Sequence, residues 1–516
     1  MNNNKVNFNK CVEILDTTLR DGEQTPGVAF APAEKLAIAQ MLVGILKIDR
    51  LEIGSARVSD GEKVGVKNII DWAKSINKHE AMEILSFVDG GKSIDWVKSV
   101  DGKVVNLLTK GSKAHCEIQL KKKPADHFAD VKREIEYAVK NDMIVNVYLE
   151  DWTNGMLNSR NYVYEFMKVL QDCPVARIML PDTLGITNPE TLTENLNWMY
   201  DNFPWAKLDF HGHNDYGLVS ANSLAAIKCG ISGVHTTING LGERTGNQPL
   251  AQLVVIINDM TDRCCNVLES ELFAATSMIQ NISGKRCGWN FPIVGADVFT
   301  QTCGVHADGD KKGNLYVNKL LPERFGRHRN YALGKLSGKA SLDKNLEELG
   351  IDLDAEIKVK VLQEIIRFGD KKKTVSASDL PFLIANALKT PFHSKLKVID
   401  YRVENGFNKI PNAVVKIKYN DKIVENKATG DGGYDAFVKA MRKNLKALNM
   451  SMPALLDYEV RIPPGGKTDA LVETTITWDV IKGHSYLSTV GVDSDQMVAA
   501  IIATEKMLNL IMQDEK

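Results

Sequence analysis

Two histidines spaced two residues apart are the most informative feature of this sequence. His211 and His213 lie in the segment FHGHNDYG. On a β-strand, residues i and i+2 point to the same face, so both imidazoles would face one site. Two imidazoles on one face are typical of metal ligands, whereas a single buried histidine is more often a core residue. We therefore interpret the pair as part of a metal site.

Two further residues can complete such a site with oxygen ligands. Asp21 follows the first predicted strand, in DTTLRDGEQTPG, and Asn247 follows the last one, in GERTGN. Two imidazoles, one carboxylate and one amide form a mixed set without thiolate, which suits Mg, Mn or Zn without choosing among them. Arg20, directly before Asp21, is either a structural ion-pair partner or a group that stabilises an oxyanion or binds a carboxylate.

Three more side chains could take part in chemistry at the same place. Glu150 ends a predicted strand in YLEDWTNG, where it can act as an acid–base group or be a solvated carboxylate. Thr183, in PDTLG, can donate to a substrate carboxylate or cap a helix. His306, in the glycine-rich segment GVHADGDKKGNLY, is either an inert surface residue or part of a lid.

The elements that must position these residues follow a repeated order through the first half of the chain. Short β-branched or apolar runs end in polar residues and alternate with segments of helical apolar spacing. The runs span 12–16, 50–55, 82–88, 104–109, 144–150, 176–182, 207–213 and 233–239. This order predicts right-handed βαβ units, and eight units favour a closed (β/α)8 TIM barrel, an α/β fold, over an open doubly wound sheet. Active sites of such barrels lie at the carboxyl ends of the strands, where these polar residues fall.

The second half of the chain is organised differently. Residues 1–285 would form the barrel, and 286–392, with helical patterns over 352–368 and 378–388, would form helical linker subdomains with a lid segment. The pattern over residues 393–516 predicts an α+β domain in which a run of strands followed by one amphipathic helix occurs twice, as an internal pseudo-twofold repeat. A cleft between the two halves could bind a small ligand, or the domain could serve structure or dimerisation.

Composition restricts the function classes. The 64 Lys and Arg residues balance 65 Asp and Glu residues, which argues against a nucleic-acid partner. There is no apolar run of bilayer length and no signal-peptide core, and the 8 cysteines form no C-x-x-C pair. We expect a soluble, reduced, cytoplasmic protein with no membrane partner. The segment PPGGKT lacks the first glycine of a P-loop, so nucleotide hydrolysis is not predicted.

Four motifs taken together resemble the α-isopropylmalate, homocitrate and citramalate synthase family of Claisen-type acyl-CoA condensing enzymes. They are DTTLRDGEQ, HGHND, NGLGERTGN and GVHADG. The resemblance extends over nearly the whole chain, including the C-terminal regulatory domain, and segments such as LEDWTNG and YEVRIPPGGKTDALVET are most similar to bacterial citramalate synthases. Leu336, in LGKLSGK, stands where leucine-pathway relatives often have histidine, which argues against the leucine branch.

The resemblance implies a metal site, a 2-keto acid site and a segment contributed by the partner subunit of a homodimer. The metal would be bound by Asp21, His211, His213 and Asn247. The segment that closes over the site would contribute Asp308, Asn314, Leu315 and, in a catalytic role, Tyr316.

The resemblance also implies the course of the reaction. The metal would polarise the ketone of the 2-keto acid, and Arg20 would stabilise the developing oxyanion. Glu150 and His306 would remove a methyl proton from acetyl-CoA, and water would hydrolyse the thioester. The C-terminal domain of this family typically binds the end product of the pathway.

Three apolar residues bear on which keto acid is used. Leu85, Leu108 and Tyr148 lie near the ends of predicted strands three to five, where they would form a small pocket or pack the barrel interior. A small pocket suits the methyl group of pyruvate, although one methylene is worth only about 1–3 kcal/mol.

We therefore expect an acyltransferase of isoleucine biosynthesis that makes (R)-citramalate and is inhibited by isoleucine. The alternative is a 2-isopropylmalate synthase that uses 2-ketoisovalerate and is inhibited by leucine. A metal-dependent acyl-CoA lyase and a non-enzymatic amino-acid sensor are further alternatives; the intact set of polar residues argues against the sensor.

Overall fold

The structure, a computed structural model, describes residues 10–348, 351–370, 380, 383–384, 395–462, 472–481 and 485–512. The chain divides into two compact units, Met1–Phe299 with Asn318–His328, and Thr300–Val317 with Arg329–Lys516. Most of the predicted helix 378–388, the predicted boundary after residue 392 and the segment PPGGKT lie outside the described residues. No helix in the described ranges combines the length and apolar character needed to cross a membrane.

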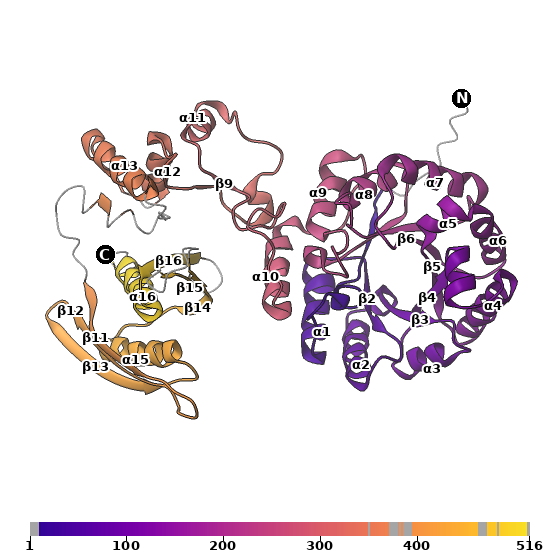
Figure 1. The fold of residues 1–516 in the computed structure, drawn as a ribbon, viewed down its shortest axis with the longest axis horizontal. Coiled ribbons are helices and arrows are strands. Elements are labelled where there is room, and N and C mark those ends of the chain that lie inside the picture. The colour runs from indigo at the N-terminus through magenta and orange to yellow at the C-terminus, as the bar shows by residue number, and fades with distance from the viewer. Residues whose placement is uncertain are drawn as a thin grey trace. The chain divides into compact units, whose positions relative to one another are not determined.

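The first unit is a closed barrel of parallel strands, drawn in indigo to magenta in Figure 1. In chain order the strands are β1 (Glu13–Asp16), β2 (Arg50–Ser55), β3 (Met82–Phe87), β4 (Val104–Lys110), β5 (Ile144–Glu150), β6 (Arg177–Asp182), β7 (Leu208–Gly212) and β8 (Gly233–Thr236). β8 pairs with β1, with Leu15 opposite His235, which closes the barrel. The predicted TIM barrel is confirmed. β8 is shorter than its predicted run because Asn239 adopts a φ of 59° in a helical turn.

Helices cover the outside of the barrel, as Figure 1 shows. They are α1 (Pro32–Ala39), α2 (Asp60–Ser75), α3 (Lys92–Ser99), α4 (Pro124–Lys140), α5 (Trp152–Asn158), α6 (Arg160–Gln171), α7 (Pro189–Asn202), α8 (Val219–Lys228), α9 (Leu250–Met260) and α10 (Leu272–Ser283). In α4, Pro124 begins the helix, where no amide donor is needed, and Phe128, Val131 and Ile135 are buried at helical spacing. Each such side chain contributes about 1.5–3 kcal/mol of burial free energy.

Alternation along the strands divides apolar from polar side chains. On β4, Val105 and Leu107 belong to the large apolar core between strands and helices. Asn106, between them, instead accepts a hydrogen bond from the Asn146 amide and donates one to Glu52. The period of two thus sends polar side chains into the barrel interior.

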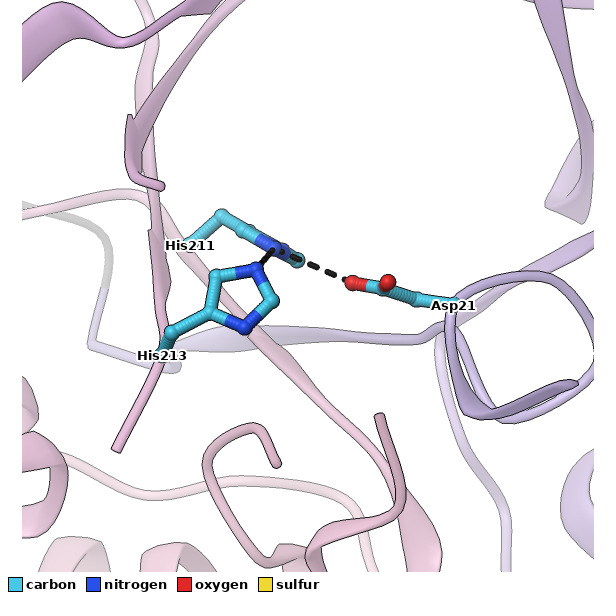
Figure 2. Close-up of side chains that lie close together, drawn as sticks. All are labelled: Asp21, His211 and His213. Atoms are coloured by element: carbon cyan, nitrogen blue, oxygen red, sulfur yellow. Dashed lines mark hydrogen bonds and ion pairs between the residues drawn. The ribbon is translucent and has the colours of Figure 1, made fainter. Parts of the chain in front are cut away.

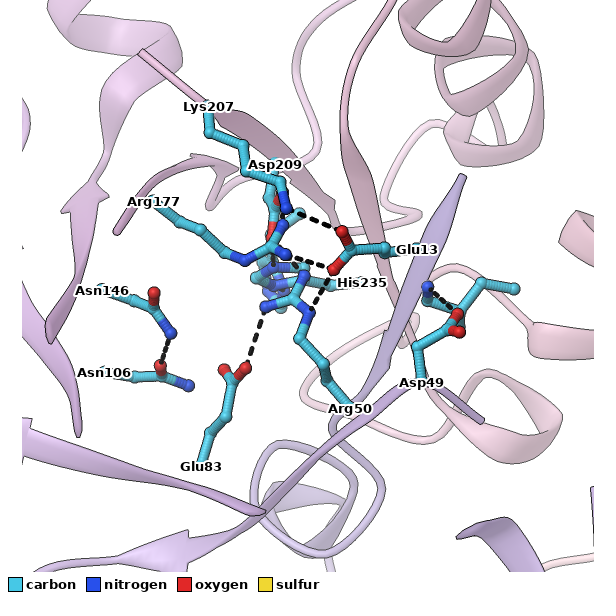
Figure 3. A network of polar contacts seen from close by, with 12 residues as sticks. Glu13, Asp49, Arg50, Glu83, Asn106, Asn146, Arg177, Lys207, Asp209 and His235 are labelled. Carbon is cyan, nitrogen blue, oxygen red and sulfur yellow. Dashed lines mark hydrogen bonds and ion pairs between the residues drawn. The ribbon is translucent and has the colours of Figure 1, made fainter. Parts of the chain in front are cut away.

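The barrel interior contains a buried ionic network, which Figure 3 shows. Arg50 and Arg177 both donate to the Asp209 carboxylate, and Arg50 also donates to Glu83 at 2.9 Å. The Glu13 carboxylate binds Arg177 as well. Interiors of this fold are commonly filled by branched apolar residues. Here each buried charge is instead matched by an opposite one, since a single unpaired charge would be costly.

The second unit begins with short elements and a small apolar core. β9 (Thr300–Gln301) pairs with β10 (Asn330–Tyr331), and the helices are α11 (Gly304–Gly313), α12 (Lys339–Glu348) and α13 (Ala355–Asp370). Leu342 and Leu346 of α12 pack with Val361 and Ile365 of α13. The structure thus has a helix where the pattern over 352–368 predicts one.

The remainder of the second unit repeats one order of elements. β11 (Leu396–Glu404), β12 (Asn412–Tyr419) and β13 (Lys422–Thr429) precede α15 (Gly433–Ala447); β14 (Ala454–Arg461), β15 (Val472–Ile481) and β16 (Ser485–Asp493) precede α16 (Gln496–Ile511). Each set of strands forms a three-stranded antiparallel sheet. Both helices contribute to one apolar core, and Tyr434 on α15 hydrogen-bonds Thr504 on α16 at 2.7 Å. The predicted α+β domain, with its repeated strand–helix order, is confirmed.

Candidate metal centre and active site

The side chains of Asp21, His211 and His213 converge at the carboxyl ends of the barrel strands, as Figure 2 shows. His211 Nε2 lies 3.2 Å from Asp21 Oδ2 and 3.4 Å from His213 Nε2. One ligand atom from each residue lies within 4.8 Å of the others, and all three side chains are buried. Ligand atoms held at about 2.1 Å from an ion are about 3.0–3.4 Å apart, so these donor atoms have the spacing of a coordination shell.

The sequence explains why the histidines face one another. His211 is on β7 and His213 follows its end, so the two share the inward face, whereas Phe210, directly before His211, packs into the apolar core. Asp21 follows β1, which lies beside β8 because the barrel is closed. Residues that are far apart in the sequence therefore meet at this site.

Asn247 is placed to add an amide oxygen. It forms an isolated antiparallel bridge with His213. Its Nδ2 donates to the Leu241 carbonyl at 2.9 Å, which fixes the orientation of the amide. Its Oδ1 is buried, with no hydrogen-bond partner among the described residues. A buried acceptor without a donor is costly, and a cation would satisfy it. The donor set of imidazole, carboxylate and amide therefore fits a divalent metal.

Burial and neighbouring charges set the ionisation of the cluster. Burial raises the pKa of Asp21, but the Arg20 guanidinium and the His211 imidazole together lower it by more than burial raises it. The pKa of Asp21 therefore lies well below its usual range. Burial lowers the pKa of His213 to about 4. At neutral pH the site thus presents a carboxylate and a neutral His213 ring, the forms that bind a metal.

Arg20 lies beside this cluster and is fixed from two sides. Its Nε donates to Glu52 at 2.5 Å, and its Nη1 lies 3.3 Å from Asp21 Oδ1. Its guanidinium carbon is 5.9 Å from the centre of the Tyr148 ring. The structural ion pair considered from the sequence is therefore present, and it holds the guanidinium next to the metal cluster. Sequence reasoning missed Glu52; the available signal was an acidic residue inside the apolar run of β2.

Glu150 ends β5 and forms an ion pair with Lys110, which ends β4. Lys110 is nearly buried, and its backbone amide donates to His127 Nε2 at 3.2 Å. The sequence analysis named Glu150 and missed Lys110, although a lysine directly follows the predicted run 104–109. The pair fixes the carboxylate at the strand ends and argues against a freely solvated glutamate.

His127 leads to a prediction about pH. Burial lowers its pKa to about 4, whereas a histidine in the unfolded chain titrates near about 6.5. Between these values the unfolded state binds more protons, so His127 makes stability fall as the pH falls. Asp16, whose pKa burial raises to about 6, acts in the opposite direction.

We therefore expect His127→Gln, which keeps the acceptor for Lys110, to lose less stability than the parent between pH 7 and 4.5. Urea unfolding of metal-free protein measures this; equal losses would contradict it.

Thr183 follows β6, and its side chain hydrogen-bonds the backbone at the start of α5. Its hydroxyl oxygen accepts a hydrogen bond from the Asp151 amide at 2.9 Å. Asp151 precedes α5 in a left-handed conformation with φ of 65°. The hydroxyl proton remains available for donation, since the contact uses only the oxygen. Both the structural contact and a substrate contact are compatible with this geometry.

The three residues predicted to line the keto acid pocket lie together. Leu85 and Tyr148 form an apolar cluster with Leu15 and Met179, against which Leu108 packs. The Tyr148 and His211 ring centroids are 6.0 Å apart, so this cluster borders the metal cluster.

The remaining candidates belong to the second unit. His306 lies on α11, and its ring stacks on Tyr316 with centroids 4.2 Å apart. Asn314 ends α11 in a left-handed conformation, and Asp308 pairs with Lys312. Leu315 is 73% exposed. The role of these residues stays a prediction.

Sequence models of known families match the barrel and the two segments that follow it. The sequence model of the HMGL-like family matches residues 11–278, which form the barrel. The homocitrate synthase post-HMGL domain-like model matches 293–373, and that of the LeuA allosteric (dimerisation) domain matches 374–512. The (R)-citramalate synthase CimA of Methanocaldococcus jannaschii is 30% identical over 97% of this chain and 99% of its own length. The chain belongs to the HMGL-like family of citramalate and 2-isopropylmalate synthases.

Other family members, which carry two different names, also match this chain over nearly its whole length. A protein of Methanothermobacter thermautotrophicus, provisionally named (R)-citramalate synthase CimA, is 32% identical over 98% of this chain and 99% of its own length. A protein of Methanopyrus kandleri named as a probable 2-isopropylmalate synthase is 30% identical over 96% of this chain and 98% of its own length. These relatives are archaeal, whereas the resemblance pointed to bacterial citramalate synthases. The nearly equal identities leave the keto acid to be decided by the pocket.

Proposed function

We propose that this protein condenses acetyl-CoA with pyruvate, in a metal-dependent reaction, to give (R)-citramalate and free CoA. The observation that carries the proposal is the buried cluster of Asp21, His211 and His213 bordered by Arg20 and by the apolar residues around Tyr148. Relatives named (R)-citramalate synthase support it.

The metal cluster and Arg20 would bind the keto acid. Asp21, His211, His213 and Asn247 would hold a divalent ion, which would supply Lewis acidity to the ketone. Arg20 keeps one edge on Glu52 and presents its charge where the ketone oxygen becomes an alkoxide. The methyl group of pyruvate would lie against Leu85 and Leu108.

Glu150 and His306 would handle the proton of acetyl-CoA. Glu150 takes a proton from the methyl group, assisted by His306, and the Lys110 ion pair holds the carboxylate in place. The resulting enolate carbon attacks the keto carbon of pyruvate, so the new C–C bond forms as the π bond of the ketone breaks. The alkoxide then takes up a proton and becomes the hydroxyl group of citramalate. Water then cleaves the thioester and releases CoA.

Release of free CoA, followed with a thiol reagent, tests the proposal directly. The assay uses acetyl-CoA with pyruvate or with 2-ketoisovalerate, and we expect the higher kcat/KM with pyruvate. Preference for 2-ketoisovalerate would identify a 2-isopropylmalate synthase instead. Cleavage of a hydroxyacyl-CoA without condensation would identify a lyase, and no turnover with any keto acid would favour a sensor.

The pocket assignment predicts a change of specificity. Leu108→Ala should raise the kcat/KM for 2-ketoisovalerate relative to that for pyruvate by about 10-fold to 100-fold, because removing methylenes makes room for the isopropyl group. Leu107→Ala is the matched control. Leu107 is the neighbouring residue on β4, but it packs outward into the main core, so its loss should lower stability and leave the ratio unchanged. An unchanged ratio in Leu108→Ala would remove Leu108 from the pocket.

The part of the chain that follows the barrel would regulate and complete the enzyme. We place the barrel at 1–285, the linker at 286–392 and the regulatory domain at 393–516. In a homodimer, the segment with His306, Asp308, Asn314, Leu315 and Tyr316 would close over the partner's site, with Tyr316 in a catalytic role, while Thr183 binds the substrate carboxylate. Isoleucine would inhibit at the regulatory domain, as expected of an enzyme of isoleucine synthesis; inhibition by leucine instead would favour the alternative function.

A further inference from the structure

A third buried histidine lies directly behind the metal cluster. His235 is on β8, and its Nδ1 is 3.3 Å from His211 Nδ1 and 3.1 Å from the Tyr148 hydroxyl oxygen. The His235 side chain is 0% exposed. His211 thus has two different sides: Nε2 faces Asp21 and His213, and Nδ1 faces His235.

The other nitrogen of His235 faces a carboxylate that is firmly held. His235 Nε2 lies 3.6 Å from Asp209 Oδ2. Asp209 is on β7, two residues before His211, and both Arg50 and Arg177 donate to it. Asp209 therefore remains charged and fixed, and it belongs to the ionic network of the barrel interior that Figure 3 shows.

With a cation bound to His211, these contacts imply where the protons lie. If Nε2 of His211 binds a cation through its lone pair, the ring proton must be on Nδ1. That Nδ1–H then points at His235 Nδ1, which must be the acceptor, so the proton of His235 lies on Nε2 and faces the Asp209 carboxylate. The Tyr148 hydroxyl can only donate to the same acceptor. With this tautomer, the contact between the two Nδ1 atoms joins a donor to an acceptor, whereas a proton on His235 Nδ1 would set one donor against another. His235 Nε2 has no hydrogen-bond partner among the described residues, and its attraction to Asp209 at 3.6 Å is electrostatic.

We propose that His235 is a positioning residue for the metal site: together with Asp209, it holds His211 in the tautomer and orientation that present Nε2 to the metal. This proposal rests on the metal site of the proposed function. The partner of the second nitrogen of a metal-binding histidine commonly affects affinity by about 10-fold to 100-fold. The sequence contained a signal for this role: His235, in GVHTTIN, falls on the inward face of the eighth strand, and that strand lies next to the strand that carries His211.

Binding of Mn²⁺ to the metal-free full-length protein, measured by EPR of the free ion, tests the proposal without any turnover. His235→Leu should raise the Kd for Mn²⁺ about 10-fold to 100-fold, because the acceptor for His211 is lost. His235→Gln should restore most of the affinity, since its amide oxygen can accept the same hydrogen bond. Asn146→Leu is the matched control: it also places leucine inside the barrel, but Asn146 pairs with Asn106 and not with His211, so its Kd should not change.

A second variant keeps the test decisive if His235→Leu does not fold. Asp209→Asn can present an amide N–H to His235 Nε2, which favours the wrong tautomer, and should also weaken Mn²⁺ binding. Circular dichroism of the metal-free proteins establishes folding. Wild-type affinity in folded His235→Leu or Asp209→Asn would overturn the positioning role, while the metal site would stand. Failure of the parent protein to bind Mn²⁺ would overturn the metal site itself.

Discussion

His213→Ala should abolish tight binding of divalent metal and lower kcat/KM for pyruvate by about a thousandfold, because a Lewis acid supplies several kcal/mol to the transition state. His213 is one of three buried ligands whose donor atoms lie within 4.8 Å of one another. Removing this imidazole leaves Asp21, His211 and Asn247 as ligands, with a gap that water can fill. Titration with Mn²⁺ and the CoA-release assay measure the two effects on the same preparation.

The control for this experiment is a histidine that lies away from the site. His79 precedes β3, at the opposite end of the barrel strands, and contacts the Asp101 carbonyl. His79→Ala should bind Mn²⁺ and release CoA as the parent does. Parent-like affinity in His213→Ala would show that this cluster does not bind the metal.

Glu150→Gln should lower the rate of condensation by about 10²-fold to 10⁴-fold, the usual contribution of a general base, and leave Mn²⁺ affinity unchanged. The glutamine retains the size of the side chain and its place beside Lys110, but it cannot accept the methyl proton. Exchange of the acetyl-CoA methyl protons in D₂O, followed by mass spectrometry, isolates this step from the later C–C bond formation.

The matched control for Glu150→Gln is Glu165→Gln. Glu165 is an exposed residue on α6, so the same change of charge occurs outside the barrel mouth. Exchange should be unaffected in this variant. Normal methyl exchange in Glu150→Gln would assign proton removal to another group.

The sequence predicted those parts of the site that depend on local periodicity. The spacing of His211 and His213 places them on one face of β7 because strand side chains alternate, and eight alternating units predict a barrel whose carboxyl ends meet. The closure of that barrel brings Asp21 to the histidines. Leu85 and Tyr148 gather in one cluster for the same reason, since each occupies an inward position near the end of its strand.

The contacts made between strands could not be predicted in this way. Lys110 with Glu150, Arg20 with Glu52 and His235 with His211 each join different strands of the barrel or a strand to a neighbouring loop. Which inward side chains meet depends on the register between strands, and register is a property of pairing that the period of one strand does not contain.

The sequence by itself therefore determined the barrel, the repeated C-terminal domain and the chemical types gathered at the rim. Tertiary structure alone decided how those groups are held. The Asn247 amide is oriented by its hydrogen bond to the Leu241 carbonyl, the Arg20 guanidinium by its hydrogen bond to Glu52, and the His211 ring by its contact with His235. The physical reason is that hydrophobic periodicity is read along one element, whereas hydrogen-bond partners are chosen by the distances between elements once the barrel has closed.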